Sequence, residues 1–289
     1  VHRFAGACSP RNGYAKGTEA QMKLVLMGTN GFVVPIFEKI ANAGHEIMAV
    51  YTRAPKPVGR RHVLTPSPVH DWAAGRGIAV YHNPREYDMH PDMVVVVSYG
   101  AILRDNVLSS APCINIHPSD LPKYRGPSPI RSAIYNGDAA SAVCLMQVTP
   151  ELDAGDVYMR RAFEIGENDT NADIENRVSE IGGDMLVQYL AAPEKYSPVA
   201  QTGTPTFTRK FTGDDEIIDW TRPPRDIHNQ VRALGAGRTK ISGIDVKVLE
   251  TKVTDGQLQI TRIQPAGKKP MDWKSFVNGL HGAEIKKGE

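Results

Sequence analysis

Short apolar runs alternate with amphipathic segments along residues 22–190, and this alternation is the main structural signal in the chain. Continuous apolar runs, such as the one within residues 92–100, are typical of strands buried on both faces of a parallel sheet. Strands are predicted at residues 23–28, 45–52, 78–82, 92–100, 113–116, 142–148 and 156–165. Helices are predicted at residues 31–44, 67–77, 102–108, 129–137 and 171–191. The alternation predicts one α/β domain with a doubly wound, Rossmann-like sheet.

Proline, glycine and serine mark the ends of two predicted helices. Pro35 lies in the first turn of one helix, where the missing N–H is tolerated, and Gly44 lies just past its end. Ser67 stands immediately before Pro68, in the position of a helix cap. Residues 53–66 carry no helical or strand pattern and are predicted to form a loop.

The two ends of this domain are marked by changes in composition. Residues 191–212 are rich in proline, threonine and glycine, which predicts a linker. Residues 1–21 show no periodicity and precede Met22, where the first strand begins. We expect residues 1–21 to be a disordered extension or an expression remnant.

A second, smaller region follows the linker, at residues 213–289. Its pattern predicts a helix at residues 223–235 and strands at residues 243–253 and 257–265. Asp255-Gly256 lies between the two strands and is a typical hairpin turn. These elements predict a β-rich second domain.

Bulk composition excludes few classes of protein, but it gives some indication of the cellular compartment. The 289 residues are 41% hydrophobic and 23% charged, as in ordinary globular proteins. The net charge of +2 does not by itself indicate a nucleic-acid binder, although local basic clusters can still form a binding face. Cys8, Cys113 and Cys144 show neither metal nor disulfide spacing, which fits a reducing compartment and predicts a cytoplasmic protein without a metal site.

The first strand-to-helix turn argues against a nicotinamide enzyme. Its sequence, "GTNGF", lacks the G-x-G-x-x-G spacing that lets the backbone approach a pyrophosphate. The second strand ends at Thr52-Arg53, so no acidic residue is placed to bind a ribose.

Candidate chemistry lies at the end of the strand "CINI". Asn115 and His117 alternate along this strand and therefore face the same side, at the sheet edge where doubly wound folds bind ligands. An amide donor beside an imidazole suits the oxyanion of an acyl-transfer intermediate. Asp153, in the turn "ELDAGDVY", is placed to hold His117 or to take up a proton. Alone, the Asn-x-His pattern favours a structural hydrogen-bonded pair over a catalytic one.

Three motifs in order, the Asn-x-His strand end, "SDLPKYRG" and "LDAGD", resemble those of the folate-dependent formyltransferases. Further stretches, "PKPVGRRHVLTPSPV", "VVVVSYGAIL" and "IQPAGKKPM", are similar to members whose acceptor is methionyl initiator tRNA. The resemblance extends from Met22 to Met271. It implies transfer of a formyl group from N10-formyl-tetrahydrofolate to the amine of methionyl initiator tRNA by a monomeric enzyme that supports translation initiation.

The resemblance also implies roles for individual residues. Asn115 and His117 would stabilise the oxyanion, and Asp153 would orient His117 and move protons. The folate pocket would be lined by Ser119, Asp120, Leu121 and Pro122 and closed by Tyr99 and Gly100. The acceptor end of the tRNA would meet Lys56, Arg60 and Arg61. The second domain would be an OB-like barrel that contacts tRNA phosphates.

The chain departs from the family pattern at two places. Asp120 stands where the family usually has leucine, which places an added carboxylate beside the expected folate site. A stretch expected between residues 253 and 257 is missing, so the predicted barrel is shortened. Three alternatives remain open on the sequence: a sugar-nucleotide N-formyltransferase, a formyl-tetrahydrofolate hydrolase, and a non-catalytic RNA-binding protein derived from an enzyme.

Overall fold

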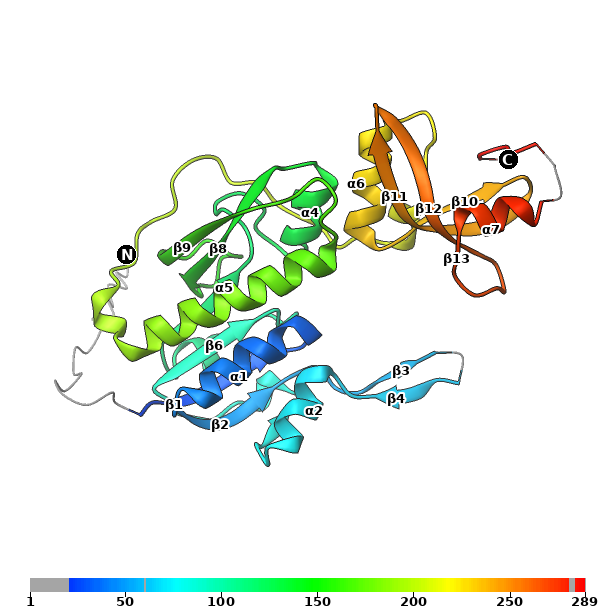
Figure 1. Ribbon diagram of the computed structural model, residues 1–289. Helices are drawn as coiled ribbons and strands as arrows, with labels where there is room; N and C mark the ends of the chain where they lie inside the picture. The colour runs from blue at the N-terminus through cyan, green and yellow to red at the C-terminus, as the bar shows by residue number, and fades with distance from the viewer. Residues whose placement is uncertain (1–20, 60, 281–283, 289) are drawn as a thin grey trace, which may run out of the picture.

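The computed structural model describes residues 21–59, 61–280 and 284–288, which form an α/β domain and a smaller β-rich domain (Figure 1). The prediction made for residues 1–21 therefore lies almost entirely outside the described residues. No helix within the described part of the chain is long and apolar enough to cross a membrane.

A seven-stranded sheet forms the centre of the α/β domain, in the order β5-β2-β1-β6-β7-β8-β9. Its strands are β1 (Lys23–Gly28), β2 (Glu46–Tyr51), β5 (Val80–Tyr81), β6 (Met93–Val97), β7 (Cys113–His117), β8 (Ala140–Gln147) and β9 (Val157–Glu164). The strands from β5 to β7 pair in parallel, whereas β8 and β9 pair antiparallel. The predicted α/β, Rossmann-like fold is confirmed, with an antiparallel extension on one edge.

Helices cover the sheet on both faces. They are α1 (Val34–Asn42), α2 (Pro68–Gly75), α3 (Asp105–Leu108), α4 (Pro129–Tyr135) and α5 (Asn171–Ala191), with short 3-10 turns η1 (Gly31–Val33), η2 (Pro84–Glu86) and η3 (Pro193–Lys195). Helices α1 and α5 run together over one face, as Figure 1 shows, and enclose a core in which Leu24, Phe37 and Ile114 are fully buried. The predicted cap is confirmed, since the Ser67 hydroxyl accepts a hydrogen bond from the His70 N–H at 3.0 Å.

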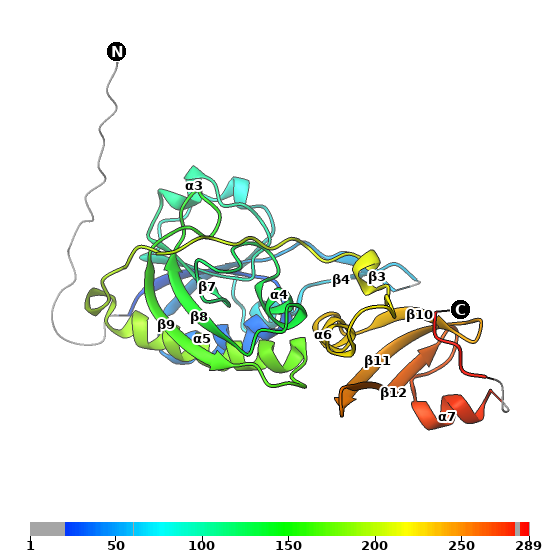
Figure 2. The ribbon, with the colours of Figure 1, turned by 90° about the horizontal axis from the view of Figure 1, so that it is seen from above.

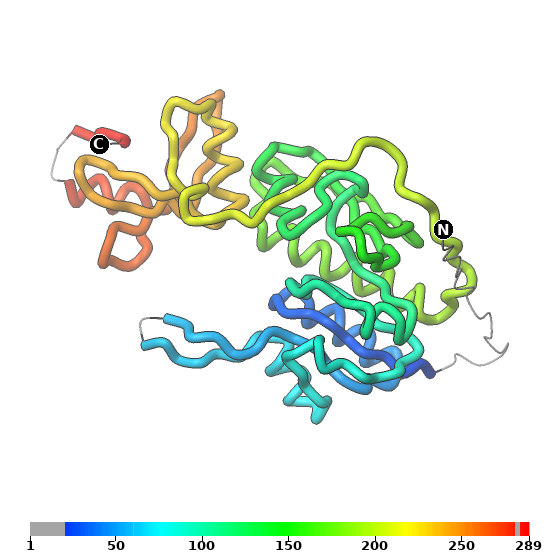
Figure 3. Tube along the Cα trace, turned by 180° about the vertical axis from the view of Figure 1, so that it is seen from behind, coloured from blue at the N-terminus to red at the C-terminus, as the bar shows by residue number. Residues whose placement is uncertain are grey.

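Residues 53–66 correct the prediction of an irregular loop. They contain an antiparallel ribbon of β3 (Lys56–Val58) and β4 (Val63–Thr65), which projects from the domain (Figures 1 and 3). Gly59 adopts a φ of 70° at the turn, a conformation that glycine takes without steric cost. The ribbon is fully exposed, so it lacks the buried face that makes a strand recognisable in a sequence.

The predicted linker lies against the α/β domain rather than hanging free (Figure 2). After α5 the chain forms isolated bridges between Val199 and Val157 and between Phe207 and Arg125. It then enters the 3-10 turn η4 (Gly213–Glu216).

The second domain holds one four-stranded antiparallel sheet, in the order β10-β11-β12-β13. Its elements are α6 (Pro224–Leu234), β10 (Gly237–Ile241), β11 (Ile244–Thr254), β12 (Gln257–Pro265), β13 (Met271–Asp272) and α7 (Trp273–Asn278). Asp255 and Gly256, with φ of 51° and 73°, form the predicted hairpin turn. The sequence prediction missed β10, β13 and α7.

Helix α6 joins the two domains through polar contacts. Arg232 Nη1 donates hydrogen bonds to the carbonyl oxygens of Asp169 at 2.7 Å and Gly166 at 3.2 Å. His228 Nε2 lies 3.0 Å from the carbonyl oxygen of Glu167, and its Nδ1 lies 2.9 Å from Thr251 Oγ1. Burial is the main cause that lowers the pKa of His228. The interface is therefore built from specific hydrogen bonds that fix the orientation of α6.

Candidate active site

His117 ends β7 and is held in one orientation by the loop that follows it. The side chain is only 5% exposed. Its Nε2 lies 3.0 Å from the carbonyl oxygen of Tyr124. A carbonyl oxygen can only accept, so Nε2 carries the hydrogen and donates it. Nδ1 is then the ring nitrogen that faces Asp153, whose Oδ2 lies 3.7 Å away. That separation is longer than a hydrogen bond but short enough for a direct electrostatic interaction.

Asp153 lies in the turn between β8 and β9, and a backbone hydrogen bond holds its carboxylate in place. Its Oδ2 accepts a hydrogen bond of 2.7 Å from the backbone N–H of Gly126. Its φ of 48° places it in the left-handed region, where aspartate is one of the better tolerated residues. The turn thus brings the carboxylate to the imidazole across 36 residues of chain, as the sequence predicted.

Asn115 lies on the same face of β7 as His117, two residues earlier. It is half-buried and is paired in register with Val96 on β6 and Met146 on β8. A central position between two neighbouring strands fixes the backbone of Asn115, and therefore the direction in which its side chain leaves the sheet.

The four residues expected to line a folate pocket lie in the loop after His117 and differ in their exposure to solvent. Ser119 and Leu121 are fully buried, and the Ser119 hydroxyl donates to the carbonyl oxygen of Lys123 at 2.5 Å. Pro122 is half-buried and Asp120 is exposed. In this conformation Ser119 and Leu121 shape the loop from within, while Asp120 and Pro122 remain accessible.

Asp120, which departs from the family leucine, is paired with a cation. Arg160 on β9 forms an ion pair with its carboxylate, and Arg160 Nη2 also donates to the carbonyl oxygen of Leu121 at 2.6 Å. The added negative charge is therefore balanced locally by an arginine that also fixes the loop backbone.

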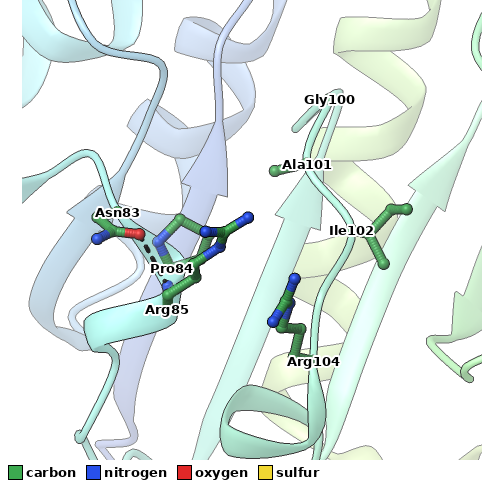
Figure 4. Close-up of a pocket in the computed structure, with 7 residues that line it drawn as sticks. All are labelled: Asn83, Pro84, Arg85, Gly100, Ala101, Ile102 and Arg104. Atoms are coloured by element: carbon green, nitrogen blue, oxygen red, sulfur yellow. Dashed lines mark hydrogen bonds between the residues drawn. The ribbon is translucent and has the colours of Figure 1, made fainter.

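A cavity of about 430 Å³ opens beside the loop that follows β6. Its lining residues are Asn83, Pro84, Arg85, Gly100, Ala101, Ile102 and Arg104 (Figure 4). Figure 4 shows Arg85 and Arg104 projecting into the space between η2 and this loop. Two guanidinium groups beside an exposed isoleucine suit a ligand with an apolar ring and anionic groups.

The cavity includes one of the two residues predicted to close the folate pocket, Gly100, and adjoins the other. Tyr99 is itself buried, and burial raises its pKa to about 12. Val97 at the end of β6 pairs with Ile116 on β7, so the loop with Tyr99 and Gly100 starts beside the end of β7 that carries His117.

Two of the three basic residues expected at the tRNA, Lys56 and Arg61, lie on the projecting ribbon. Lys56 belongs to β3 and is exposed, and Arg61 is exposed at the turn. Arg60 lies outside the described residues. The ribbon and the second domain extend from the same end of the α/β domain, as Figures 1 and 3 show, so both can face one large partner.

Cys113 plays no part in nucleophilic chemistry. It begins β7, four residues before His117, and is buried. Burial raises the pKa of its thiol to about 12, so a thiolate is not formed near neutral pH.

Sequence reasoning missed the groups that hold the site together. Two of them belong to the backbone, the Tyr124 carbonyl and the Gly126 N–H, and leave no side-chain signal. Another is Gln201 in the linker, whose partners lie 46 to 76 residues away along the chain.

Comparisons with known proteins show the family to which the chain belongs. Residues 22–190 match the family model described as formyl transferase. The chain is 35% identical over 292 residues to the methionyl-tRNA formyltransferase of Jannaschia sp., covering 89% of this chain and 97% of that protein.

Solved structures share the fold at lower identity. The methionyl-tRNA formyltransferase from Clostridium thermocellum matches with a TM-score of 0.58 at 16% identity, over 85% of this chain and 99% of that chain. The sugar 3N-formyl transferase WlaRD, in the presence of dTDP and 5-N-formyl-THF, matches with a TM-score of 0.65 at 18% identity, over 86% and 100%. These structural likenesses show the fold alone.

Proposed function

This chain belongs to the methionyl-tRNA formyltransferase family, and from that premise we propose how its site performs formyl transfer. The protein is an enzyme that transfers a formyl group to the amine of methionyl initiator tRNA, a step that supports translation initiation. The observation that carries this function is the identity of 35% over 97% of the length of relatives with that activity in their names. The sugar-formyltransferase alternative has support only from fold likeness at 20% identity or less.

N10-formyl-tetrahydrofolate is the donor in this proposal. Two features support it: a related fold was solved with 5-N-formyl-THF, and the cavity beside β6 combines apolar surface with Arg85 and Arg104. Guanidinium groups pair well with carboxylates, which the glutamate end of a folate provides. In this proposal the accessible Asp120 and Pro122, in the loop after His117, also contact the donor, and the buried Ser119 and Leu121 hold that loop in shape.

Formyl transfer then proceeds as an acyl transfer. The lone pair of the methionyl α-amine attacks the formyl carbon, a new C–N bond forms, and the carbonyl electron pair moves to oxygen. The Asn115 amide donates a hydrogen bond to this oxyanion, and His117 Nδ1 donates a second one once it has taken up the proton of the attacking amine, because Nε2–H is already bonded to the Tyr124 carbonyl. The bond from the formyl carbon to N10 then breaks, and its electron pair goes to N10.

The reaction moves one proton, which His117 carries while Asp153 stabilises the positive charge on the ring. The attacking amine loses a proton, and N10 gains one as it leaves. A carboxylate 3.7 Å from His117 Nδ1 can stabilise a transient imidazolium, so His117 takes the proton from the amine and delivers it to N10. Protons and electrons balance, with the formyl group on the amine and tetrahydrofolate as the other product.

The ribbon and the second domain hold the tRNA, and the enzyme acts as a monomer. Lys56 and Arg61 lie exposed on the ribbon, where they can pair with phosphates of the acceptor end. Arg60, which lies next to Arg61 in the sequence, would take part as well. The second domain would meet the body of the tRNA through its sheet.

The test is transfer of labelled formyl from N10-formyl-tetrahydrofolate to methionyl initiator tRNA, with free methionine and a dTDP-amino sugar as alternative acceptors. Label should appear on the tRNA alone. His117→Ala should lower the rate by at least about 100-fold, while His90→Ala, at an exposed histidine, should not. Release of formate without tRNA product would indicate a hydrolase instead. Near-normal transfer by His117→Ala would refute the assignment of the site.

A further inference from the structure

The linker completes the active-site loop with a run of backbone hydrogen bonds. We call residues 199–208 the strap. Arg125 N–H donates to Thr206 O at 2.8 Å, and Thr208 N–H donates to Arg125 O at 2.7 Å. Thr206 N–H donates to Pro122 O at 3.2 Å. The strap therefore extends along the same loop that supplies the backbone groups holding His117 and Asp153.

One side chain of the strap, Gln201, reaches both halves of the site. Its Nε2 donates to the carbonyl oxygens of Asp153 and Gly155, each at 2.8 Å. Its Oε1 accepts from Arg125 Nη2 at 2.8 Å and from Arg125 Nε at 3.1 Å. A side-chain amide can donate on one side and accept on the other without a charge. Gln201 thus joins the turn after β8 to the loop after β7.

We propose that Gln201 is a positioning residue for formyl transfer, which sets the separation between Asp153 and His117. The proposal rests on the proposed function. Gln201 fixes the backbone of Asp153 through its carbonyl, and Gly126 fixes the carboxylate. Gly126 directly follows Arg125, the other partner of Gln201. The two contacts on Asp153 therefore come from segments that Gln201 itself connects.

The conformation of Asp153 is one that surrounding contacts can stabilise, even though aspartate tolerates it better than most residues. Its φ of 48° is sparsely populated for a residue with a side chain, and such conformations persist where the surroundings over-determine them. Glu151, an acidic partner of Arg125, has a side chain that is 76% exposed and contacts Arg125 at 3.3 Å. Arg125 is itself buried, so the firm link from its guanidinium to the turn is the amide of Gln201.

Two substitutions distinguish the role of the amide N–H donor from that of the amide oxygen acceptor. Gln201→Glu keeps an acceptor for Arg125 but replaces the donor with an oxygen that faces two carbonyl oxygens. Gln201→Met removes both sides at similar volume. We expect each variant to lower kcat by about 10- to 100-fold, with little change in KM for methionyl-tRNA or in the urea midpoint. Thr202→Ala, at the exposed neighbour, is the matched control and should behave like the wild-type protein.

A double-mutant cycle tests whether Gln201 acts through Asp153. Asp153→Ala alone should lower kcat, and adding Gln201→Glu should then cost almost nothing further, because the group being positioned is already absent. Independent, additive losses would overturn the proposal. So would full activity of Gln201→Glu, which would show that the Arg125 contact alone matters. A loss of activity that follows a loss of folded protein would also overturn it.

The wild-type protein in the same assay separates this proposal from the function beneath it. Absence of formyl transfer by the wild-type protein would refute the proposed function and the positioning role together. An active wild-type protein beside a fully active Gln201→Glu variant would refute the positioning role alone.

Discussion

Replacing Gly155 with alanine tests whether the turn that carries Asp153 must keep its path. The added Cβ would lie 2.0 Å from the carbonyl oxygen of Gln147 and 2.8 Å from its carbonyl carbon. Both atoms belong to the backbone at the end of β8, so no rotation of a side chain relieves the overlap. Ordinary van der Waals contact begins at 3.4 Å, so the turn must move by roughly 1 Å or more.

A movement of that size is large beside the 3.7 Å between His117 Nδ1 and Asp153 Oδ2. Misplacement of a catalytic group by about 1 Å lowers rates by about 100-fold. Overpacking of a well-filled site costs roughly 1–3 kcal/mol of folding free energy. We therefore expect Gly155→Ala to remain folded, to lose this much stability, and to show a kcat about 100-fold below that of the wild-type protein.

The assay is steady-state formyl transfer to methionyl-tRNA, with urea unfolding of the same preparations. Gly75→Ala is the matched control, because nothing lies within 4 Å of its added Cβ and Gly75 ends helix α2. Alanine there should keep the activity and raise stability by roughly 0.5–1 kcal/mol. A kcat near the wild-type value in Gly155→Ala, or an equal loss in Gly75→Ala, would refute the reasoning.

Three further predictions follow from single contacts. Asp120→Leu removes an exposed ion pair with Arg160, so the unfolding free energy should change by less than about 1 kcal/mol; a larger loss in urea unfolding would show that the pair anchors the loop. Arg61→Ala should lower kcat/KM for methionyl-tRNA and reduce the slope of its logarithm against the logarithm of salt concentration by about 1, the value for one phosphate contact; an unchanged slope would exclude that contact. Burial lowers the pKa of His228 in the folded state, so the unfolded chain binds more protons as the pH falls below the ordinary histidine value, and stability should fall there. His228→Gln should lose less stability than the wild-type protein between neutral and mildly acidic pH, and equal losses in urea unfolding would contradict this.

The central strands could be predicted because burial on both faces leaves a signal that needs no knowledge of the partner strand. Residues 92–100 contain β6, in which every residue from Met93 to Val97 is buried. The ribbon and β10 lack such a signal. β10 alternates buried and exposed residues over only five positions, which is too short a pattern to predict a strand. The strand is stabilised by its pairing with β11, which the sequence of β10 alone does not indicate.

The direction of β8 relative to β7 could not be predicted from the local sequence pattern either. Its apolar run, six buried residues between two exposed ones, looks the same whether the strand pairs parallel or antiparallel with β7. Orientation depends on the path of the connection, here through α4, and a connection is not encoded in the strand that it leads to.

The same distinction holds for the candidate site. The residues proposed for the chemistry stand in short motifs, whereas the residues that hold them in place do not. Asn115, His117 and Asp153 could be proposed from the sequence because each stands at a strand end or in a turn, within a motif of a few residues. Gln201 could not be found in that way, since a glutamine in a polar stretch rich in proline and threonine is typical of a linker. Its role becomes visible only when the turn and the loop are brought together in space.

The position of the second domain depends on this interdomain segment and on α6 more than on the completeness of its sheet. Beyond the strap, Phe211 packs on Tyr135 of α4, and Arg222 donates to the Tyr135 hydroxyl at 3.0 Å. Arg232 then binds the carbonyl oxygens of Gly166 and Asp169. These contacts come from the linker, from Arg222 after it and from α6, all of which precede the hairpin of β11 and β12. The orientation of the second domain therefore depends on contacts made before its longest strands begin.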